Sequence, residues 1–288
     1  MHRPPNIAAA AILAVALLAA PASAQPIEAW RVTGFDLPES VSYDPGTNTL
    51  FVSNVASADM MPNGAGFITQ LNLDGTVAAE RFVEGLDTPR GTDVREGTLW
   101  VAGSALYEID IATATVVNSF TADGAVFPND VFAAEDGRVF VTDTFAGAIF
   151  VLEDGAFSLW LQDPALGFAN GITIVDGTMY VARVGEGAGE FANLQPSNVK
   201  TVDLATKAIG DYGSPAGIGG LDGIEPMEGG MLVTDNGGGR LLRVASDGTV
   251  TALAEPGAGA ADLEYIAAEG LAVVPMLTTG EVVAYRVE

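Results

Sequence analysis

Cysteine is absent from the 288-residue chain, and the single histidine, His2, lies in an N-terminal segment that we expect to be removed. Without cysteine there are no disulfides, no thiolate ligands and no site for lipoprotein attachment. Without histidine the rest of the chain cannot use Ser-His-Asp or Cys-His catalysis or the usual zinc sites. Any metal must therefore be held by oxygen, as Ca²⁺, Mg²⁺ and Mn²⁺ are, and any general base must be Asp, Glu, Lys, Tyr or a metal-activated water.

Basic residues are scarce as well: 12 Lys and Arg stand against 37 Asp and Glu, which gives a net charge of −25 at pH 7. Such a surface repels nucleic acid and anionic lipid, so we expect neither as a partner. The charge is compatible with attraction of cations, although keeping an exported protein soluble is the simpler explanation. We expect a monomer whose partner is a small-molecule substrate or ligand.

Long apolar runs are lacking beyond residue 24, so no later segment is expected to span a membrane. The segment before it has a basic residue, Arg3, then an apolar run over residues 7–20 and an A-x-A cleavage site at residues 22–24. This pattern is typical of a secretory signal peptide, and an N-terminal anchor helix is the alternative. We therefore predict a signal peptide over residues 1–24, a single domain over residues 25–288, and a periplasmic or secreted protein.

Six short strand-like runs of similar pattern recur along the chain. They begin at Leu50, Leu99, Val139, Met179, Met231 and Leu271, which are 49, 40, 40, 52 and 40 residues apart. A turn and another short strand precede each run, an alternating strand follows it, and a fourth strand completes the first five units. Four antiparallel strands at a period near 40 residues are typical of the blades of a β-propeller.

The sixth unit contains only three strands, and an unassigned strand, Glu28 to Phe35, precedes the first unit. Pairing this strand with Val282 to Val287 would complete the sixth blade, close the ring and remove the free sheet edges. A β-sandwich, the competing architecture, explains neither the period nor the missing strand. The sequence therefore predicts an all-β fold, a six-bladed β-propeller with four antiparallel strands per blade.

The first strand of each blade lines the axis, and its first residue should lie at one mouth of the central channel. Aligning the six units on their second strands places Glu39, Arg90, Asn129, Asn170, Asp222 and Asp262 in that ring. Five of these side chains offer oxygen, and the three carboxylates would repel one another unless a cation neutralised them. The alternative is that they only begin strands, where Asn and Asp are common turn residues.

The steps that open these blades, Glu39, Asn129-Asp130, Asn170-Gly171 and Asp222-Gly223, resemble those of the SMP-30/gluconolactonase family of six-bladed propellers. The resemblance covers essentially the whole chain after residue 24. It implies metal ligation by Glu39, Asn170 and Asp222, a further active-site residue in Asn129, and hydrolysis of sugar lactones. The family uses Ca²⁺, Zn²⁺ or Mn²⁺; without histidine we expect Ca²⁺ here, with Mg²⁺, Mn²⁺ or Zn²⁺ as alternatives.

The chain departs from the family pattern at two places. The first-blade stretch reads Glu39-Ser40-Val41-Ser42-Tyr43 without the usual proline, and the sugar-binding arginine two residues before the Asn-Asp step is replaced by Phe127. The implied metal ligands are therefore kept, whereas recognition of a sugar is not implied.

For a lactone or ester hydrolase we assign Asp222 as general base or water-orienting group, with Asn129 and Asn170 holding the substrate oxygen. Arg90 would pair with a substrate carboxylate or phosphate, or else neutralise the carboxylates of the ring. The substrate-binding candidates are Arg90, Asn129, Asp130, Arg183 and Asp262. Further candidates for the pocket wall are Asn54, Asp143, Asp235 and Asn236.

Two long loops, residues 55–66 and 184–198, account for the two larger repeat spacings and should border the same mouth. Their candidate apolar contacts are Met60, Met61, Phe191 and Leu194. Two functions remain open. The chain is either an exported metal-dependent lactone or ester hydrolase, or a non-catalytic propeller that binds a small ligand or a protein at this mouth.

Overall fold

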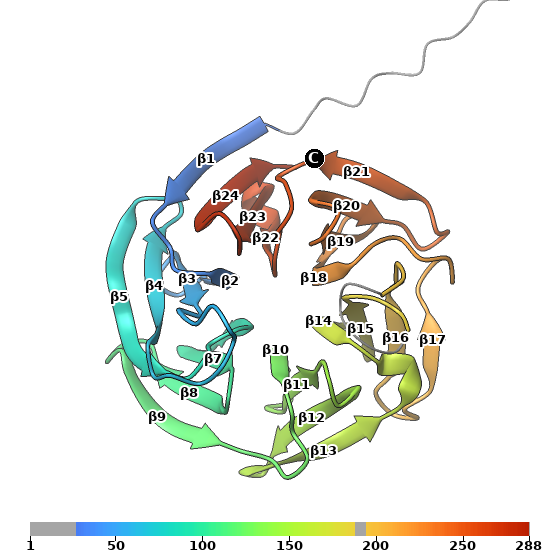
Figure 1. Cartoon of the computed structure of the whole chain (residues 1–288), viewed down its shortest axis with the longest axis horizontal. Helices are drawn as coiled ribbons and strands as arrows, with labels where there is room; N and C mark the ends of the chain where they lie inside the picture. The colour runs from blue at the N-terminus through green and yellow to red at the C-terminus, as the bar shows by residue number, and fades with distance from the viewer. Residues whose placement is uncertain (1–26, 188–193, 288) are drawn as a thin grey trace, which may run out of the picture.

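The computed structural model describes residues 27–187 and 194–287. Six four-stranded antiparallel sheets surround a central axis, as Figure 1 shows. The predicted six-bladed propeller is thereby confirmed. The expected signal peptide and Phe191 lie outside the described residues.

Each of the first five blades runs in chain order from the axis outward. Blades 1 and 2 consist of β2 (Pro38–Asp44), β3 (Thr49–Asn54), β4 (Gly66–Asn72) and β5 (Val77–Leu86), then β6 (Thr92–Arg95), β7 (Thr98–Ala102), β8 (Leu106–Asp110) and β9 (Thr115–Phe120). Blades 3 and 4 consist of β10 (Pro128–Ala133), β11 (Val139–Asp143), β12 (Ala148–Glu153) and β13 (Ala156–Gln162), then β14 (Ala169–Val175), β15 (Thr178–Arg183), β16 (Lys200–Asp203) and β17 (Ile209–Asp211). Blade 5 consists of β18 (Leu221–Met227), β19 (Gly230–Asp235), β20 (Arg240–Val244) and β21 (Val250–Ala254).

The sixth blade contains both ends of the described chain. It consists of β22 (Glu264–Ile266), β23 (Leu271–Met276), β24 (Glu281–Arg286) and, outermost, β1 (Ile27–Thr33). The outer strand pairs antiparallel with β24, and the Trp30 indole N–H donates to the Leu73 carbonyl at 2.8 Å. The ring is therefore closed between the N-terminal strand and the last blade, as the missing strand predicted.

The core lies between neighbouring blades. Alternating apolar residues on the two middle strands of each blade face the next blade, and they form six buried clusters around the ring. Phe51, Phe140 and Phe150 are among the largest side chains that are fully buried there. Besides the strands, the chain has short 3₁₀ turns at Pro164–Leu166 and Ala267–Glu269. Within the described residues, no helix has the length and hydropathy to cross a membrane.

Candidate functional site

An extra residue interrupts the inner strand of four blades. In β2, Pro38 pairs with Asn54 and Val41 pairs with Val52, so Glu39 and Ser40 lie opposite one residue of β3. The inner strands β10, β14 and β18 have the same irregularity at the same place. A bulge re-aims the side chains of a strand and is common beside functional sites. The first residues of the four bulges are Glu39, Asn129, Asn170 and Asp222.

In three of these blades, a hydroxyl group on the second strand accepts a hydrogen bond from a backbone N–H of the bulge. The Thr142 hydroxyl accepts the Asp130 N–H at 3.0 Å and donates to the Asn170 carbonyl at 2.7 Å. Ser53 and Thr234 accept the equivalent N–H groups in blades 1 and 5. In blades 3 and 5 the hydroxyl thus joins the bulge to the next blade, since Thr234 also donates to the Ala261 carbonyl at 2.8 Å.

The glycines of the Asn-Gly and Asp-Gly steps permit close contact between blades. A Cβ atom at Gly171 would lie 2.3 Å from the Asp222 carbonyl oxygen, and one at Gly223 would lie 2.5 Å from an Asp262 carboxylate oxygen. No side chain fits at such distances without moving backbone. These two motifs therefore keep the bulged residues of neighbouring blades close together.

All four bulged residues line one pocket of about 200 Å³. We call it the axial pocket. Each of the four side chains is at most 7% exposed. The other residues that line the axial pocket are Met60, Arg90, Phe127, Thr144, Val184, Asn236 and Leu277.

One oxygen of each bulged side chain has no hydrogen-bond partner. These four buried acceptors are Glu39 Oε2, Asn129 Oδ1, Asn170 Oδ1 and Asp222 Oδ1. An unsatisfied buried acceptor costs about 1–3 kcal/mol, and it costs more when it is charged. Four of them in one pocket indicate a ligand that carries positive charge or donates hydrogen bonds. Oxygens from two carboxylates and two amides are ligands that suit a hard divalent cation.

The oxygen set mixes carboxylates with amides. Among the described residues, no three His, Cys, Asp or Glu side chains converge as a metal cluster. The fit to a cation therefore depends on Asn129 and Asn170 as well as on Glu39 and Asp222, with water or substrate completing the coordination.

Two neighbouring side chains fix which atoms face the axial pocket. Asn236 Nδ2 donates to Asp222 Oδ2 at 2.8 Å, which leaves Oδ1 for a ligand. Asn129 Nδ2 donates to the Thr144 hydroxyl at 2.8 Å, and this hydroxyl donates to the Ala169 carbonyl at 2.7 Å. The amide oxygen of Asn129 is thereby turned inward. Asn236 was a secondary candidate in the sequence, whereas Thr144 was missed; both immediately follow the second strand of their blade.

The electrostatics of the axial pocket favour a cation. Burial, and then the charges of Asp222 and Asp262, raise the pKa of Glu39 well above its usual range, against a smaller lowering by Arg90. Burial and the nearby Asp262 raise the pKa of Asp222 to about 8. Positive charge in the pocket would lower both pKa values again and keep the carboxylates ionised.

No model of a known protein family matches the chain, and no curated protein matches it either. Its structure, however, is similar to solved propellers over most of its length. A gluconolactonase from Xanthomonas campestris superposes with a TM-score of 0.69 at 16% identity, covering 92% of this chain and 95% of that chain. Regucalcin, a calcium-binding protein from Agrobacterium tumefaciens, superposes with a TM-score of 0.65 at 17% identity, covering 91% and 96%.

The chain has the six-bladed propeller fold of these two proteins. A virginiamycin B lyase from Staphylococcus aureus also superposes, with a TM-score of 0.62 at 10% identity, covering 90% of this chain and 99% of that chain. At these identities the similarity concerns the fold. The resemblance to gluconolactonase-type propellers that the blade-opening motifs indicated is confirmed at that level.

Arg90 and Phe127 form one wall of the axial pocket. The Arg90 guanidinium lies 3.9 Å from the centroid of the Phe127 ring, and its Nε donates to the Pro128 carbonyl at 2.8 Å. Burial lowers the pKa of Arg90 to about 10, against the opposing influence of Glu39, so the side chain stays charged at neutral pH. Of the described residues that line the axial pocket, Arg90 is the only basic one.

Asp130 and Asp262 lie farther down the channel and do not line the axial pocket. They belong to a separate pocket of about 220 Å³. We call its five carboxylate residues the lower carboxylate cluster: Asp93, Asp130, Glu225, Asp262 and Glu264. Blade 6 has the same irregularity, because Ala260 pairs with Met276 and Glu264 with Val273, but Asp262 is its second residue, as Asp130 is in blade 3.

Three members of this cluster, Asp93, Glu225 and Glu264, were missed by the sequence alignment. They alternate along inner strands with residues that face the other way, and this alternation is the signal that could have located them. Burial raises the pKa of Asp93 to about 7 and that of Glu264 to about 8.

The structure does not bring Arg183 to either pocket. Its guanidinium donates to the Ala165 carbonyl and to Asn198 Oδ1, each at 3.1 Å, and contacts Glu186. Among the loop residues, Met60 lines the axial pocket, whereas Leu194 lies against Gly185.

Proposed function

We propose that the chain is an exported, metal-dependent hydrolase of lactones or esters, with a divalent cation, Ca²⁺, held in the axial pocket. Its ligands would be Glu39, Asn170 and Asp222, joined by Asn129. The observation that carries this proposal is the set of four unpaired, buried oxygens that line one pocket at the axis. The gluconolactonase and the calcium-binding regucalcin that share this fold support it.

A divalent cation bound in the axial pocket would polarise the substrate carbonyl and stabilise the negative charge that develops on the carbonyl oxygen. Asp222 presents Oδ1 to the pocket while Asn236 holds Oδ2. In this role Asp222 takes a proton from the attacking water. The water adds to the carbonyl carbon, the bond from that carbon to the ester or ring oxygen breaks, and the freed oxygen takes up the proton. A lactone thus gives a hydroxy acid.

The asparagines position the substrate. The Thr144 hydroxyl holds the amide of Asn129, and the Thr142 hydroxyl holds the backbone of Asn170. Arg90 stacks on Phe127 beside the carboxylates, where it offsets part of their negative charge. Preorganised dipoles of this kind stabilise a developing charge without having to reorient during the reaction.

The second candidate function is a non-catalytic propeller that binds a small ligand at the same pocket. One observation favours this non-catalytic function: Phe127 stands where the gluconolactonase family has its sugar-binding arginine.

Hydrolysis measured in a pH-stat over a panel of lactones and aryl esters, with and without chelator, separates the two functions. The hydrolase requires turnover that chelator abolishes and Ca²⁺ restores, and loss of at least about 100-fold in kcat for Asp222→Asn. Glu225→Gln is the matched control, because Glu225 is on the same strand but in the lower carboxylate cluster. Absence of turnover of every compound, with Ca²⁺ present, would refute the hydrolase.

A further inference from the structure

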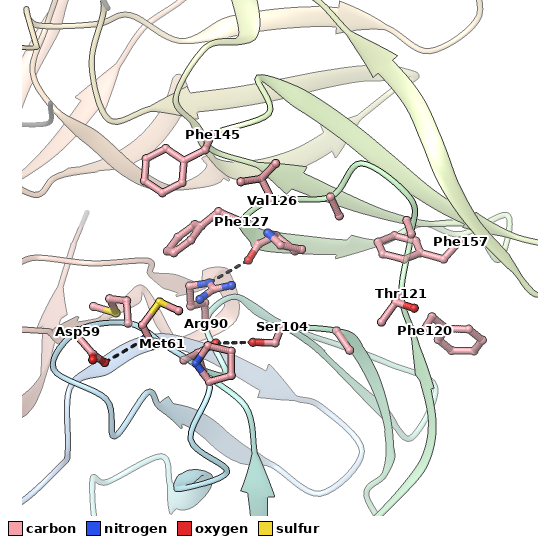
Figure 2. A pocket seen from close by; sticks show the side chains of 17 residues that line it. Asp59, Met61, Arg90, Ser104, Phe120, Thr121, Val126, Phe127, Phe145 and Phe157 are labelled. Carbon is pink, nitrogen blue, oxygen red and sulfur yellow. Dashed lines mark hydrogen bonds between the residues drawn. The ribbon is translucent and has the colours of Figure 1, made fainter. Parts of the chain in front are cut away.

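A larger pocket, of about 780 Å³, opens beside the axial pocket. We call it the apolar pocket. Its apolar side chains come from the loop after β3 and from the segments around β9, β11 and β13. Figure 2 shows the side chains that line it. The larger apolar ones are Met61, Phe120, Val126, Phe127, Phe145 and Phe157. Its volume is typical of a site for a small organic molecule.

The apolar pocket adjoins the axial pocket. Met60, Arg90 and Phe127 line both. A molecule whose reactive group lies at the four axial oxygens can therefore extend past the Arg90–Phe127 wall into the apolar pocket.

Several apolar side chains of this pocket are exposed. Val126 is 64% exposed, Met61 60% and Phe145 49%. Phe145 packs edge-on against Phe127 with ring centroids 5.0 Å apart. Figure 2 shows these rings on one side of the pocket and Met61 on the other. Exposed apolar groups gathered in a cavity, next to a polar site, are typical of a surface that a ligand covers.

The polar side chains of the apolar pocket are largely engaged with the protein. Asp59 accepts from the Ser57 hydroxyl and the Met61 N–H, and the Thr88 and Ser104 hydroxyls bond to each other at 3.0 Å. Arg90 and Thr121 also line the pocket, and together they offer few hydrogen-bonding groups for the many hydroxyls of a sugar. A hydrocarbon group, by contrast, gains from leaving water in proportion to the area that it buries.

We infer that the substrate carries an apolar group, an alkyl chain or an aromatic ring, that lies in the apolar pocket while its lactone or ester carbonyl lies at the axial oxygens. This inference rests on the proposed function and narrows its substrate class from lactones and esters in general to hydrophobic ones. Phe145 and Met61 act as specificity-determining residues, because they contact the apolar group and not the reacting atoms.

The test is a homologous series of γ-butyrolactone, γ-octalactone and γ-dodecalactone, with gluconolactone as the polar comparison. Each buried methylene contributes up to about fourfold, so kcat/KM should rise at least about 100-fold from γ-butyrolactone to γ-dodecalactone. Phe145→Ser and Met61→Ser should each lower the ratio of kcat/KM between these two substrates roughly tenfold. Leu159→Ser is the matched control, because Leu159 is also 49% exposed but does not line the apolar pocket; it should leave the ratio unchanged.

A binding measurement keeps the inference separate from the proposed function. The probe is the octyl-substituted tetrahydrofuran, which is the ether counterpart of γ-dodecalactone and cannot be hydrolysed. Binding to wild type that Phe145→Ser weakens, without turnover of any lactone, would refute the hydrolase and still support the apolar ligand class. Efficient hydrolysis of gluconolactone and γ-butyrolactone with no gain along the series and no binding of the ether would overturn the inference and leave the hydrolase standing. Neither binding nor turnover would overturn both.

Discussion

Asn129 shows how a single functional atom is oriented by residues behind it. Its amide nitrogen donates to the Thr144 hydroxyl, which in turn donates to the Ala169 carbonyl, and the amide oxygen is left facing the axial pocket. Without this relay, rotation of the amide would place N–H groups where a cation needs oxygen.

The relay makes Thr144 a positioning residue that can be tested. Thr144→Val keeps the shape but removes the hydroxyl, so Asn129 Nδ2 and the Ala169 carbonyl lose their partner. We expect a loss of about 1–3 kcal/mol in the free energy of unfolding, together with weaker Ca²⁺ binding in calorimetric titration. Thr144→Ser retains the hydroxyl and should restore binding. Equal Ca²⁺ affinity in the valine variant and wild type would contradict the orienting role.

The residues of the axial pocket were partly predictable. Glu39, Asn129, Asn170 and Asp222 occupy equivalent places in four repeats, so aligning the units on their second strands was sufficient to select them. Thr144 was not selected, because its role depends on a hydrogen bond to blade 4, and contacts between blades leave no spacing pattern in the sequence.

At the scale of the strand, the position of a residue within the bulge decides which pocket it lines: Asn129 lines the axial pocket, whereas Asp130, the next residue, lines the lower pocket. Blades 1, 3, 4 and 5 have the extra residue on the inner strand. In blade 6, Ala260 pairs with Met276 and Glu264 with Val273, which also leaves one extra residue on the inner side. The Ala261 N–H donates to the Pro275 carbonyl, as the Arg90 N–H donates to the Ala102 carbonyl in blade 2, so Ala261 holds the first position and Asp262 the second. The sequence alignment was therefore wrong by one position in this blade and placed Asp262 in the ring. Register shifts of this kind follow from the pairing of strands, whereas hydrophobic alternation located the strands themselves.

Gly171 provides a test of the contact between bulges. Gly171→Ala would place a methyl group 2.3 Å from the Asp222 carbonyl oxygen, which forces blades 4 and 5 apart. We expect a loss of about 1–3 kcal/mol in stability and weaker metal binding, because Asn170 and Asp222 separate. Gly237→Ala is the matched control, since a Cβ there meets nothing within 4 Å. Thermal unfolding and calorimetric titration of both variants measure the effect; a tolerated Gly171→Ala would mean that the blades need not approach so closely.

At the scale of the whole molecule, negative charge is concentrated along the axis that all six inner strands share. The axial pocket contains Glu39 and Asp222, and the lower carboxylate cluster contains five more acidic residues. A cation in the axial pocket would therefore stabilise the entire ring, because it joins strands from four blades.

Removal of metal should lower the melting temperature. A cation that binds only the folded state at a hundredfold excess over its Kd stabilises it by about 2.7 kcal/mol, which for a domain of this size is roughly 5–10 °C. Chelator should remove this increment in a thermal melt and Ca²⁺ should restore it. The Asp222→Asn variant should have the melting temperature of wild type in chelator, and added Ca²⁺ should not change it. A wild-type melt that responds to neither chelator nor Ca²⁺, after tightly bound metal has been removed, would argue against a metal site.

The lower carboxylate cluster predicts a pH dependence of stability that does not depend on metal. Asp93 faces Tyr43, Asp130, Glu225 and the two carboxylates of blade 6, and among the described residues that line this pocket none is basic. Burial raises the pKa of Asp93 to about 7, although Ala133 N–H donates to it at 2.7 Å and Arg95 is nearby on its own strand.

A carboxyl whose pKa is raised on folding binds more protons in the folded state than in the unfolded one. The stability that it contributes is present below its unfolded pKa, about 4, and is lost as the pH rises through its folded pKa, about 7 for Asp93 and about 8 for Glu264. In chelator, the melting temperature should therefore fall between about pH 5.5 and about pH 9. Asp93→Asn keeps an oxygen for the Ala133 N–H but cannot ionise, so its melting temperature should fall less over the same range. Asp110→Asn is the control, because Asp110 lies outside this cluster and its pKa is lowered by its Thr113 partner, which affects stability only at acid pH. Equal pH slopes for wild type and Asp93→Asn would show that Asp93 is ionised in the folded protein throughout this range.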